Sequence, residues 1–270
     1  YLEFLQKLTA FYGRDHHFYA NDLGMLGSVY HSMGKYYKAA EMMEESRATL
    51  EKLFKEDPES RAEDYAIILN NLAVLYLDMN RYRQAELLLK EASNLNNLIK
   101  KPLYDKKTTI NLATLNNIAD ALDNQYKFDQ AEEVYEEIVQ KSKIHHGQRT
   151  ESYASHLSQF AAFCIKEGAL DKAKELLNEA LVISTTPDRL VVLATIKEKE
   201  EKKEEALGHY EEALQLYQEE YGFKHPRIAA TLNQKAKLLR ILKRPAEAEK
   251  VLFEALDANS KSEQKPNPKG

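Results

Sequence analysis

The sequence predicts an all-α solenoid in which helix–turn–helix units stack on one another. Three stretches resemble one another closely, at residues 23–46, 69–92 and 115–138. A single unit of this kind cannot bury its own apolar face, so copies of it must stack. The composition agrees, because 43% of the residues are hydrophobic while only nine are Gly and seven are Pro. Such a chain can bury a continuous core and carries few helix breakers.

Six helical pairs follow from aligning the small residues of the units. The pairs start near Ala20, Ala66, Leu112, Ala154, Pro187 and Ala229. The spacings between these starts are 46, 46, 42, 33 and 42 residues. We expect residues 1–19 to form the second helix of a truncated preceding repeat, and residues 1–259 to form one right-handed superhelical domain. Residues 260–270 are polar and Pro-rich, which predicts a disordered tail.

Each pair shows the periodicity of two amphipathic helices. If positions are counted from the start of a repeat, the first helix carries apolar or small residues at positions 4, 7, 8 and 11, as in Leu23, Leu26, Gly27 and Tyr30. This spacing places them on one helical face. Position 20, in the second helix, is Ala in every repeat: Ala39, Ala85, Ala131, Ala173, Ala206 and Ala248. An invariant small residue indicates that two helix backbones approach closely there.

The turn between the two helices falls at position 15. Gly34, Asn80 and Gly168 stand there, and these residues favour a left-handed backbone. In the last two repeats, Lys203 and Pro245 replace the bulky residue that follows two positions later, so we expect looser or more exposed turns there. The fifth repeat should also be irregular in its first helix, because Lys197 occupies the core position 11.

These features are similar to those of the tetratricopeptide repeat (TPR). Small residues at positions 8, 20 and 27, a bulky residue at position 11 and a glycine turn carry the resemblance, although that repeat usually has about 34 residues. The wider spacing, the phrases LNNLA and LNNIA, and the link YGFKHPRIAATLN at 221–233 more closely resemble the 42-residue kinesin-light-chain type. The resemblance covers nearly the whole chain. It implies the fold, whereas the same scaffold serves many roles.

Charge and hydropathy exclude several classes of partner. The formal net charge of -5 gives no basic surface for nucleic acid or anionic membrane. No apolar run reaches the roughly 18 to 20 residues needed to span a bilayer, and the first residues do not resemble a signal peptide. The single Cys164 excludes an internal disulfide and favours a reducing, cytoplasmic location. We therefore expect neither nucleic acid nor membrane as a partner.

Catalytic and metal-binding patterns are weak. The pairs His16–His17 and His145–His146 fall in links between helices, and adjacent histidines do not converge on one metal without further ligands. Cys164 stands at the core position 11, where packing is a better explanation than nucleophilic chemistry. No catalytic, phosphate-binding or dinucleotide motif occurs. We expect no enzymatic activity, no catalytic residue, no metal site and no cofactor.

The concave face, lined by the first helices, is the predicted binding surface. Its positions 2, 5, 6 and 9 are rich in amides, which can pair with both the N–H and the C=O groups of an extended peptide. The candidate peptide-binding residues are Asn70, Asn71, Asn116, Asn117, Asp120, Gln159, Asn233 and Lys237. The alternative is that an Asn at position 5 or 6 only bonds a neighbouring helix and stabilises the stack.

These patterns predict a protein-interaction scaffold that binds a peptide segment of a partner protein in its groove. A second hypothesis is a sensor or regulatory arm of a larger enzyme or signalling protein, for example a protease-linked or peptide-sensing one. It is motivated by both ends of the chain, which look cut. An enzyme within these residues has no supporting motif. The sequence leaves the oligomeric state and the partner's identity open.

Overall fold

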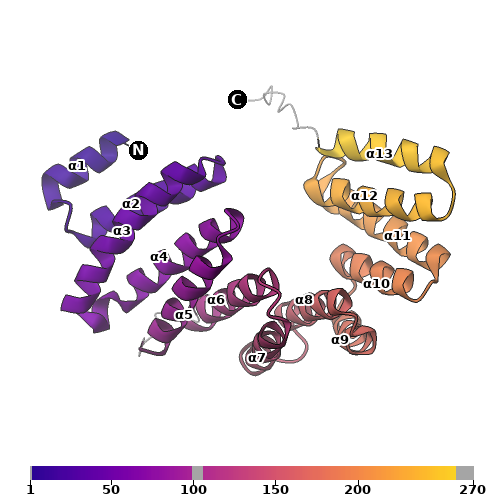
Figure 1. Ribbon diagram of the computed structural model, residues 1–270, viewed down its shortest axis with the longest axis horizontal. Coiled ribbons are helices and arrows are strands. Elements are labelled where there is room, and N and C mark those ends of the chain that lie inside the picture. The colour runs from indigo at the N-terminus through magenta and orange to yellow at the C-terminus, as the bar shows by residue number, and fades with distance from the viewer. Residues whose placement is uncertain (1, 99–105, 260–270) are drawn as a thin grey trace. The chain divides into compact units, whose positions relative to one another are not determined.

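The computed structural model describes residues 2–98 and 106–259, and the part of the chain that it describes is helical with turns and links (Figure 1). The predicted tail at 260–270 lies outside the described residues. The helices are α1 (Leu2–Tyr12), α2 (His17–Ser32), α3 (Tyr36–Glu56), α4 (Pro58–Asp78), α5 (Tyr82–Leu98), α6 (Lys106–Asp123), α7 (Phe128–His146), α8 (Glu151–Glu167), α9 (Leu170–Ile183), α10 (Pro187–Lys199), α11 (Lys203–Tyr221), α12 (Pro226–Ile241) and α13 (Pro245–Asn259).

The six predicted pairs are confirmed as α2–α3, α4–α5, α6–α7, α8–α9, α10–α11 and α12–α13. Contacts divide the chain into two compact units, unit 1 at Tyr1–His145 and unit 2 at His146–Gly270, whereas the sequence suggests one domain over 1–259. Helix α1 ends at Tyr12, so residues 17–19 already belong to the first helix of repeat one.

Several first helices begin earlier than the predicted repeat starts, because each has a local start signal. Asp57 and His225 accept hydrogen bonds from backbone N–H groups of the first turn, and each is followed by Pro at the first helical position. Thr150 caps α8 in the same way, without a proline. A capping side chain satisfies an N–H that the helix leaves unpaired, and proline there loses no hydrogen bond.

All six intra-repeat turns have the same backbone. Position 15 is left-handed in every repeat, with φ between +58° and +82°, at Gly34, Asn80, Tyr126, Gly168, Glu201 and Lys243. The N–H of position 16 donates to the C=O of position 11 in each of them, at 2.7 to 3.0 Å. The prediction of looser turns in repeats five and six is therefore wrong for the backbone. The closing hydrogen bond imposes the left-handed residue even where the side chain disfavours it.

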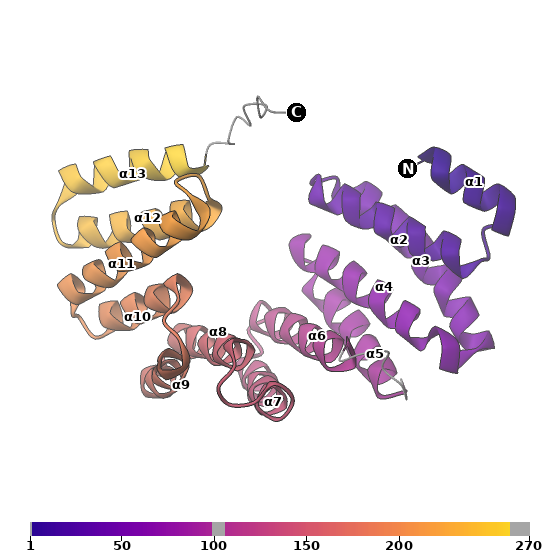
Figure 2. The same cartoon turned by 180° about the vertical axis from the view of Figure 1, so that it is seen from behind.

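Unit 1 stacks its repeats in two layers of helices. The first helices contact one another, α2 with α4 and α4 with α6, and each second helix packs against the first helix that follows it, α3 on α4 and α5 on α6 (Figures 1 and 2). The alanines at position 20 are almost fully buried, which confirms the close backbone approach. In repeat one, position 8 is Gly27 instead of Ala. A Cβ there would lie only 2.6 Å from Cγ of Met43.

Tyrosines reinforce the repeats in a way that the sequence analysis missed. In repeats one, two and four, the residue just before the repeat start is a Tyr whose hydroxyl donates to a Glu in the second helix of the same repeat. The pairs are Tyr19–Glu45, Tyr65–Glu91 and Tyr153–Glu179, at 3.1, 2.7 and 2.9 Å. Burial, together with the hydrogen bond to Glu179, raises the pKa of Tyr153 to about 12. These tyrosines are therefore neutral structural donors.

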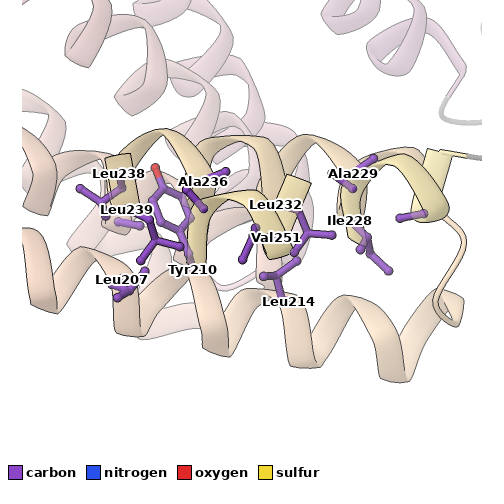
Figure 3. Packing of buried hydrophobic residues seen from close by; sticks show 14 of the residues in the cluster. Leu207, Tyr210, Leu214, Ile228, Ala229, Leu232, Ala236, Leu238, Leu239 and Val251 are labelled. Atoms are coloured by element: carbon purple, nitrogen blue, oxygen red, sulfur yellow. The ribbon is translucent and has the colours of Figure 1, made fainter. Parts of the chain in front are cut away.

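One core cluster of unit 2 runs from α10 to α13. Figure 3 shows Leu207, Tyr210 and Leu214 of α11 packed against α12, with Val251 of α13 in the same cluster. The irregularity expected in the first helix of repeat five is small, because α10 continues as a helix through Lys197. Its neighbour Ile196 is buried, while Lys197 stays half-buried and forms ion pairs with Glu200 and Glu205. The long aliphatic part of a lysine can line a core while its charged end reaches water.

Candidate functional site

The first helices of unit 1 form one continuous face. Positions 5 and 6 of α4 are Asn70 and Asn71, and the same positions of α6 are Asn116 and Asn117. All four side chains are half-buried, and Asp120, one turn further along α6, is exposed. A half-buried side chain is positioned by the packed helices around it and still has exposed atoms that can contact a ligand.

One pair of these amides bridges two repeats. The Nδ2 group of Asn117 donates to Oδ1 of Asn70 at 3.1 Å, so α6 is bonded to α4 across the face. The alternative interpretation, in which these amides only bond a neighbouring helix, predicts such a contact between Asn70 and Asn117. The bond uses one donor of Asn117 and one acceptor site of Asn70, and an amide offers two donors and an acceptor. The pair could therefore fix the helices and still bind a peptide group.

A hollow of about 210 Å³ lies at the other end of this face, between α2, α3 and α4. Leu50 and Ile68 are buried in its lining, whereas Met25 and Ile67 are 51% and 40% exposed. The remaining lining residues are Asn21, Gly24, Ser46, Asp64 and Asn71. An apolar hollow with amides beside it can accept one aliphatic side chain while the amides bond the adjacent main chain.

The position of Gly24 keeps this hollow open. A Cβ on Gly24 would lie 2.9 Å from Cδ1 of Ile68 and 3.1 Å from Oγ of Ser46. Ser46 is fully buried and donates to the backbone oxygen of Ala20 at 2.6 Å. The sequence analysis did not single out this hollow. Its signal was the apolar pair Met25 and Ile67 at the outward positions 6 and 2 of neighbouring first helices.

Polar contacts at two places fix the first helices of unit 1 at their C-terminal ends. Nε2 of His31 lies 2.6 Å from Oδ2 of Asp78, which joins α2 to α4. Glu86 of α5 accepts hydrogen bonds from Lys127 at 2.7 Å and Gln125 at 2.9 Å, both in the turn that ends α6.

The buried carboxylate of Glu86 is fully paired. Its third partner is Lys90, one turn along the same helix, at 2.6 Å. Burial alone raises the pKa of this carboxyl, but the hydrogen bonds from Lys127, Lys90 and Gln125 outweigh burial and lower the pKa to about 2. The carboxylate is therefore ionised at neutral pH, and it holds the end of α6 against α5.

The remaining predicted residues lie in unit 2. Gln159 is exposed on α8, and Asn233 and Lys237 are exposed on α12. Helix α10 comes between α8 and α12 in repeat order, so these three side chains do not form a cluster with one another. Their roles as binding residues stay predictions.

A larger hollow in unit 2, of about 660 Å³, was not anticipated. Arg189 of α10 is buried beside it and forms a two-pronged contact with Glu151 of α8, at 2.6 and 3.2 Å. Its Nε also donates to Oγ of Ser158 at 3.1 Å. These bonds tie α8 to α10 across the shortest repeat spacing. An Arg at position 3 gives no sequence signal, because that position varies in type among the repeats.

Neither a metal centre nor a membrane segment is seen in the described part of the chain. No group of three or more His, Cys, Asp or Glu side chains among residues 2–98 and 106–259 is arranged to hold a metal ion. Within the same ranges, no helix is both long and apolar enough to cross a bilayer. Cys164 is buried.

Comparison with known families defines the class of protein. The tetratricopeptide repeat family matches residues 23–59, 66–95 and 111–152 with one of its profiles and residues 189–261 with another. These matches cover more than half of the sequence, so the chain belongs to the tetratricopeptide repeat family. No curated protein matches the sequence significantly.

Three solved structures illustrate the similarity of this chain to known folds. BtubC (BKLC) from P. vanneervenii has a TM-score of 0.65 and 18% identity, over 87% of this chain and 95% of that one. A putative kinesin light chain from Podosopora anserina with nearly identical TPR-like repeats has a TM-score of 0.53 and 19% identity, over 70% and 92% of the two chains. Aspartyl phosphate phosphatase F from Bacillus subtilis has a TM-score of 0.59 and 13% identity, over 89% and 60%. At these identities, the likeness concerns the fold.

The family assignment confirms two predictions from the sequence, namely the tetratricopeptide repeat and the all-α solenoid class. Tetratricopeptide repeats in general mediate protein–protein interactions, and proteins built from them bind protein partners and generally act as scaffolds. Which surface binds, and what it binds, must be argued from the side chains of this chain.

Proposed function

We propose that this protein binds an extended peptide segment of a partner protein along the first helices of unit 1. The observation that carries the proposal is the hollow between α2, α3 and α4, with exposed Met25 and Ile67 beside its apolar lining and Asn71 at its edge. Exposed apolar side chains around a preformed hollow are typical of binding sites.

The geometry favours one aliphatic side chain of the peptide in the hollow. A volume of about 210 Å³ suits a side chain such as Leu or Met and not a folded domain. Asn71 would bond the main chain next to that residue. Asn116 and Asn117 on α6 would bond the peptide further along, since an extended chain advances about 3.3 Å per residue and presents N–H and C=O groups along its whole length.

A peptide library tests the proposal directly. Random 15-residue peptides displayed on phage would be selected against the whole chain, and the affinity of a selected peptide would be measured for Asn71→Ala and Asn117→Ala. Loss of one or two amide hydrogen bonds should weaken binding roughly five- to tenfold for each substitution. Asn94→Ala is a matched control, because Asn94 is exposed on the second helix α5.

The outcome distinguishes binding from packing. Thermal unfolding of each variant should stay close to that of the unchanged protein if the amides mainly serve the ligand. If stability falls while the affinity per folded molecule is unchanged, these amides serve only the stack, and the binding face has been assigned wrongly.

A further inference from the structure

The hollow of about 660 Å³ in unit 2, called the unit 2 hollow below, has a lining unlike that of the hollow in unit 1. It lies between the N-terminal ends of α8 and α10 and the C-terminal end of α11, and α10 contacts both of the other helices (Figure 2). The hollow in unit 1 has only one carboxylate in its lining. The unit 2 hollow has four carboxylates, at Glu151, Asp188, Glu219 and Glu220, and one cation, Arg189.

Bonds within the protein hold the walls of this hollow in place. Arg189 is 2% exposed and pairs through Nη2 with Glu151 at 2.6 Å, which ties α10 to α8. Asp188 accepts a hydrogen bond from the hydroxyl of Tyr217 at 2.5 Å and forms an ion pair with Arg227 of α12. Two of the four carboxylates thus have a cationic partner, and the hollow is preformed, as binding sites usually are.

The other two carboxylates of the lining lack a cationic partner. Glu219 and Glu220 are exposed at the end of α11, and neither forms an ion pair among the described residues. Glu219 accepts a neutral hydrogen bond from Gln215 at 3.1 Å. Lys224, the next cation along the chain, is already paired with Asp257 of α13 at 3.7 Å. The C-terminal end of a helix adds partial negative charge, so this side of the hollow favours a cation.

A tyrosine ring of fixed orientation lies beside these carboxylates. Tyr221 lines the hollow, is 42% exposed and stacks on His225 with 4.2 Å between the ring centroids. A hydrogen bond to Glu220 raises the pKa of the Tyr221 hydroxyl, so the ring and this carboxylate are neighbours. Aromatic rings attract cations, and a ring that is already held in place loses little conformational entropy when a cation binds.

The combination of carboxylates, an aromatic ring and apolar lining matches an arginine side chain. A guanidinium carries five N–H donors in one plane, pairs with carboxylates and stacks on aromatic rings. Its methylene groups pack on apolar surface, which Leu216 and Pro187 provide here. Lysine matches the charge, but its ammonium is a strongly hydrated point charge, and an anionic group would face two glutamates. The volume exceeds that of one side chain, so adjoining main chain can enter as well.

We propose that the unit 2 hollow binds an arginine side chain of a partner protein. The guanidinium pairs with Glu219 and Glu220 and lies against the ring of Tyr221. This site goes beyond the proposed function, because it uses other helices and recognises a charged side chain, whereas the first helices of unit 1 are proposed to bind extended main chain and one aliphatic residue.

Saturation-transfer NMR with small probes tests the site on the whole 270-residue chain. The first probe is N-acetyl-arginine amide, whose about 15 non-hydrogen atoms should give a Kd on the order of 1 mM. The second is the citrulline analogue, which has the same shape without the charge and should not saturate the protein below about 10 mM. The third is the lysine analogue, which should bind several-fold more weakly than the arginine probe.

Variants locate the binding and separate it from the overall acidity of the chain. Glu219→Gln with Glu220→Gln should weaken the arginine probe at least about fivefold, because it removes both unpaired carboxylates.

The matched control is Glu249→Gln with Glu254→Gln, which makes the same change in charge at two exposed glutamates of α13 and should leave the affinity unchanged. Asn71→Ala in unit 1 should also leave it unchanged. Circular dichroism melts of both double variants should match that of the unchanged chain, since all four glutamates are exposed.

Three results would overturn the proposal. The arginine probe could fail to saturate the protein below about 10 mM, or it could bind the Glu219→Gln with Glu220→Gln variant as tightly as the unchanged chain. Alternatively, spermidine could bind the hollow more tightly than the arginine probe, in which case the site takes free polyamines and not a side chain of a partner protein. None of these measurements depends on whether unit 1 binds a peptide, so the two proposals fail separately.

Discussion

The carboxylate of Glu86 makes acid sensitivity of unit 1 predictable. Glu86 is 8% exposed and accepts three hydrogen bonds, from Lys90, Lys127 and Gln125. Its pKa is lowered from 4.5 to about 2 in the folded protein. A depressed pKa contributes stability that is complete above the unfolded value and is lost as pH falls toward the folded value.

The size of the effect follows from the pKa change. A change of one in pKa corresponds to about 1.4 kcal/mol, so a fall from 4.5 to about 2 corresponds to about 3 kcal/mol. The side chains of Lys90 and Lys127 are 54% and 37% exposed, and solvent screening reduces this to about 2 kcal/mol. Glu86→Gln should lower the free energy of unfolding by about that amount at pH 7.

Urea unfolding followed by circular dichroism at several pH values between 7 and 3 provides the assay. The difference between the unchanged protein and Glu86→Gln should be constant down to about pH 5 and should lose more than half of its size by pH 3. Glu133→Gln, on the exposed side of α7, is the matched control and should change little. A difference for Glu86→Gln that stays the same from pH 7 to pH 3 would refute the reasoning.

Two further predictions concern backbone strain and packing. Lys243 has a left-handed φ of +60°, so Lys243→Gly should raise the free energy of unfolding by about 1 kcal/mol, whereas Lys250→Gly inside α13 should lower it by about as much; urea midpoints would show both signs. Gly27→Ala should destabilise by about 1 kcal/mol, because the clash with Met43 exceeds the gain in helix propensity. In a Met43→Ala background the same change should stabilise, and a double-mutant cycle measures this.

The repeat architecture could be predicted from the sequence because small residues recur at fixed positions. The alanines at position 20 and the apolar residues of the first helices identified all six pairs and their order. The turns of repeats five and six were mispredicted for a physical reason. Residue type at Glu201 and Lys243 gives no left-handed preference, while the hydrogen bond between positions 16 and 11 imposes one.

The candidate site was only partly accessible to sequence reasoning. The outward amides of α4 and α6 follow from helical periodicity, and so does their common face. The bond between Asn70 and Asn117, and the hollow beside Asn71, depend on the distance between neighbouring first helices. The contact of the buried Arg189 with Glu151 joins two neighbouring repeats at the shortest spacing, so the pattern of a single repeat does not predict it.

The turn inside each repeat is constant, whereas the length of the second helix differs between repeats. The path from the first to the second helix of a repeat is closed by the same hydrogen bond in all six copies, while the second helices that lead into the next repeat range from 14 residues in α9 to 21 in α3. The repeats thus differ in length where one repeat leads into the next, and not in the turn between their two helices. An epitope tag or a reporter domain inserted between Phe223 and Lys224, in the exposed link from α11 to α12, should therefore be tolerated far better than one placed between Gly34 and Tyr36.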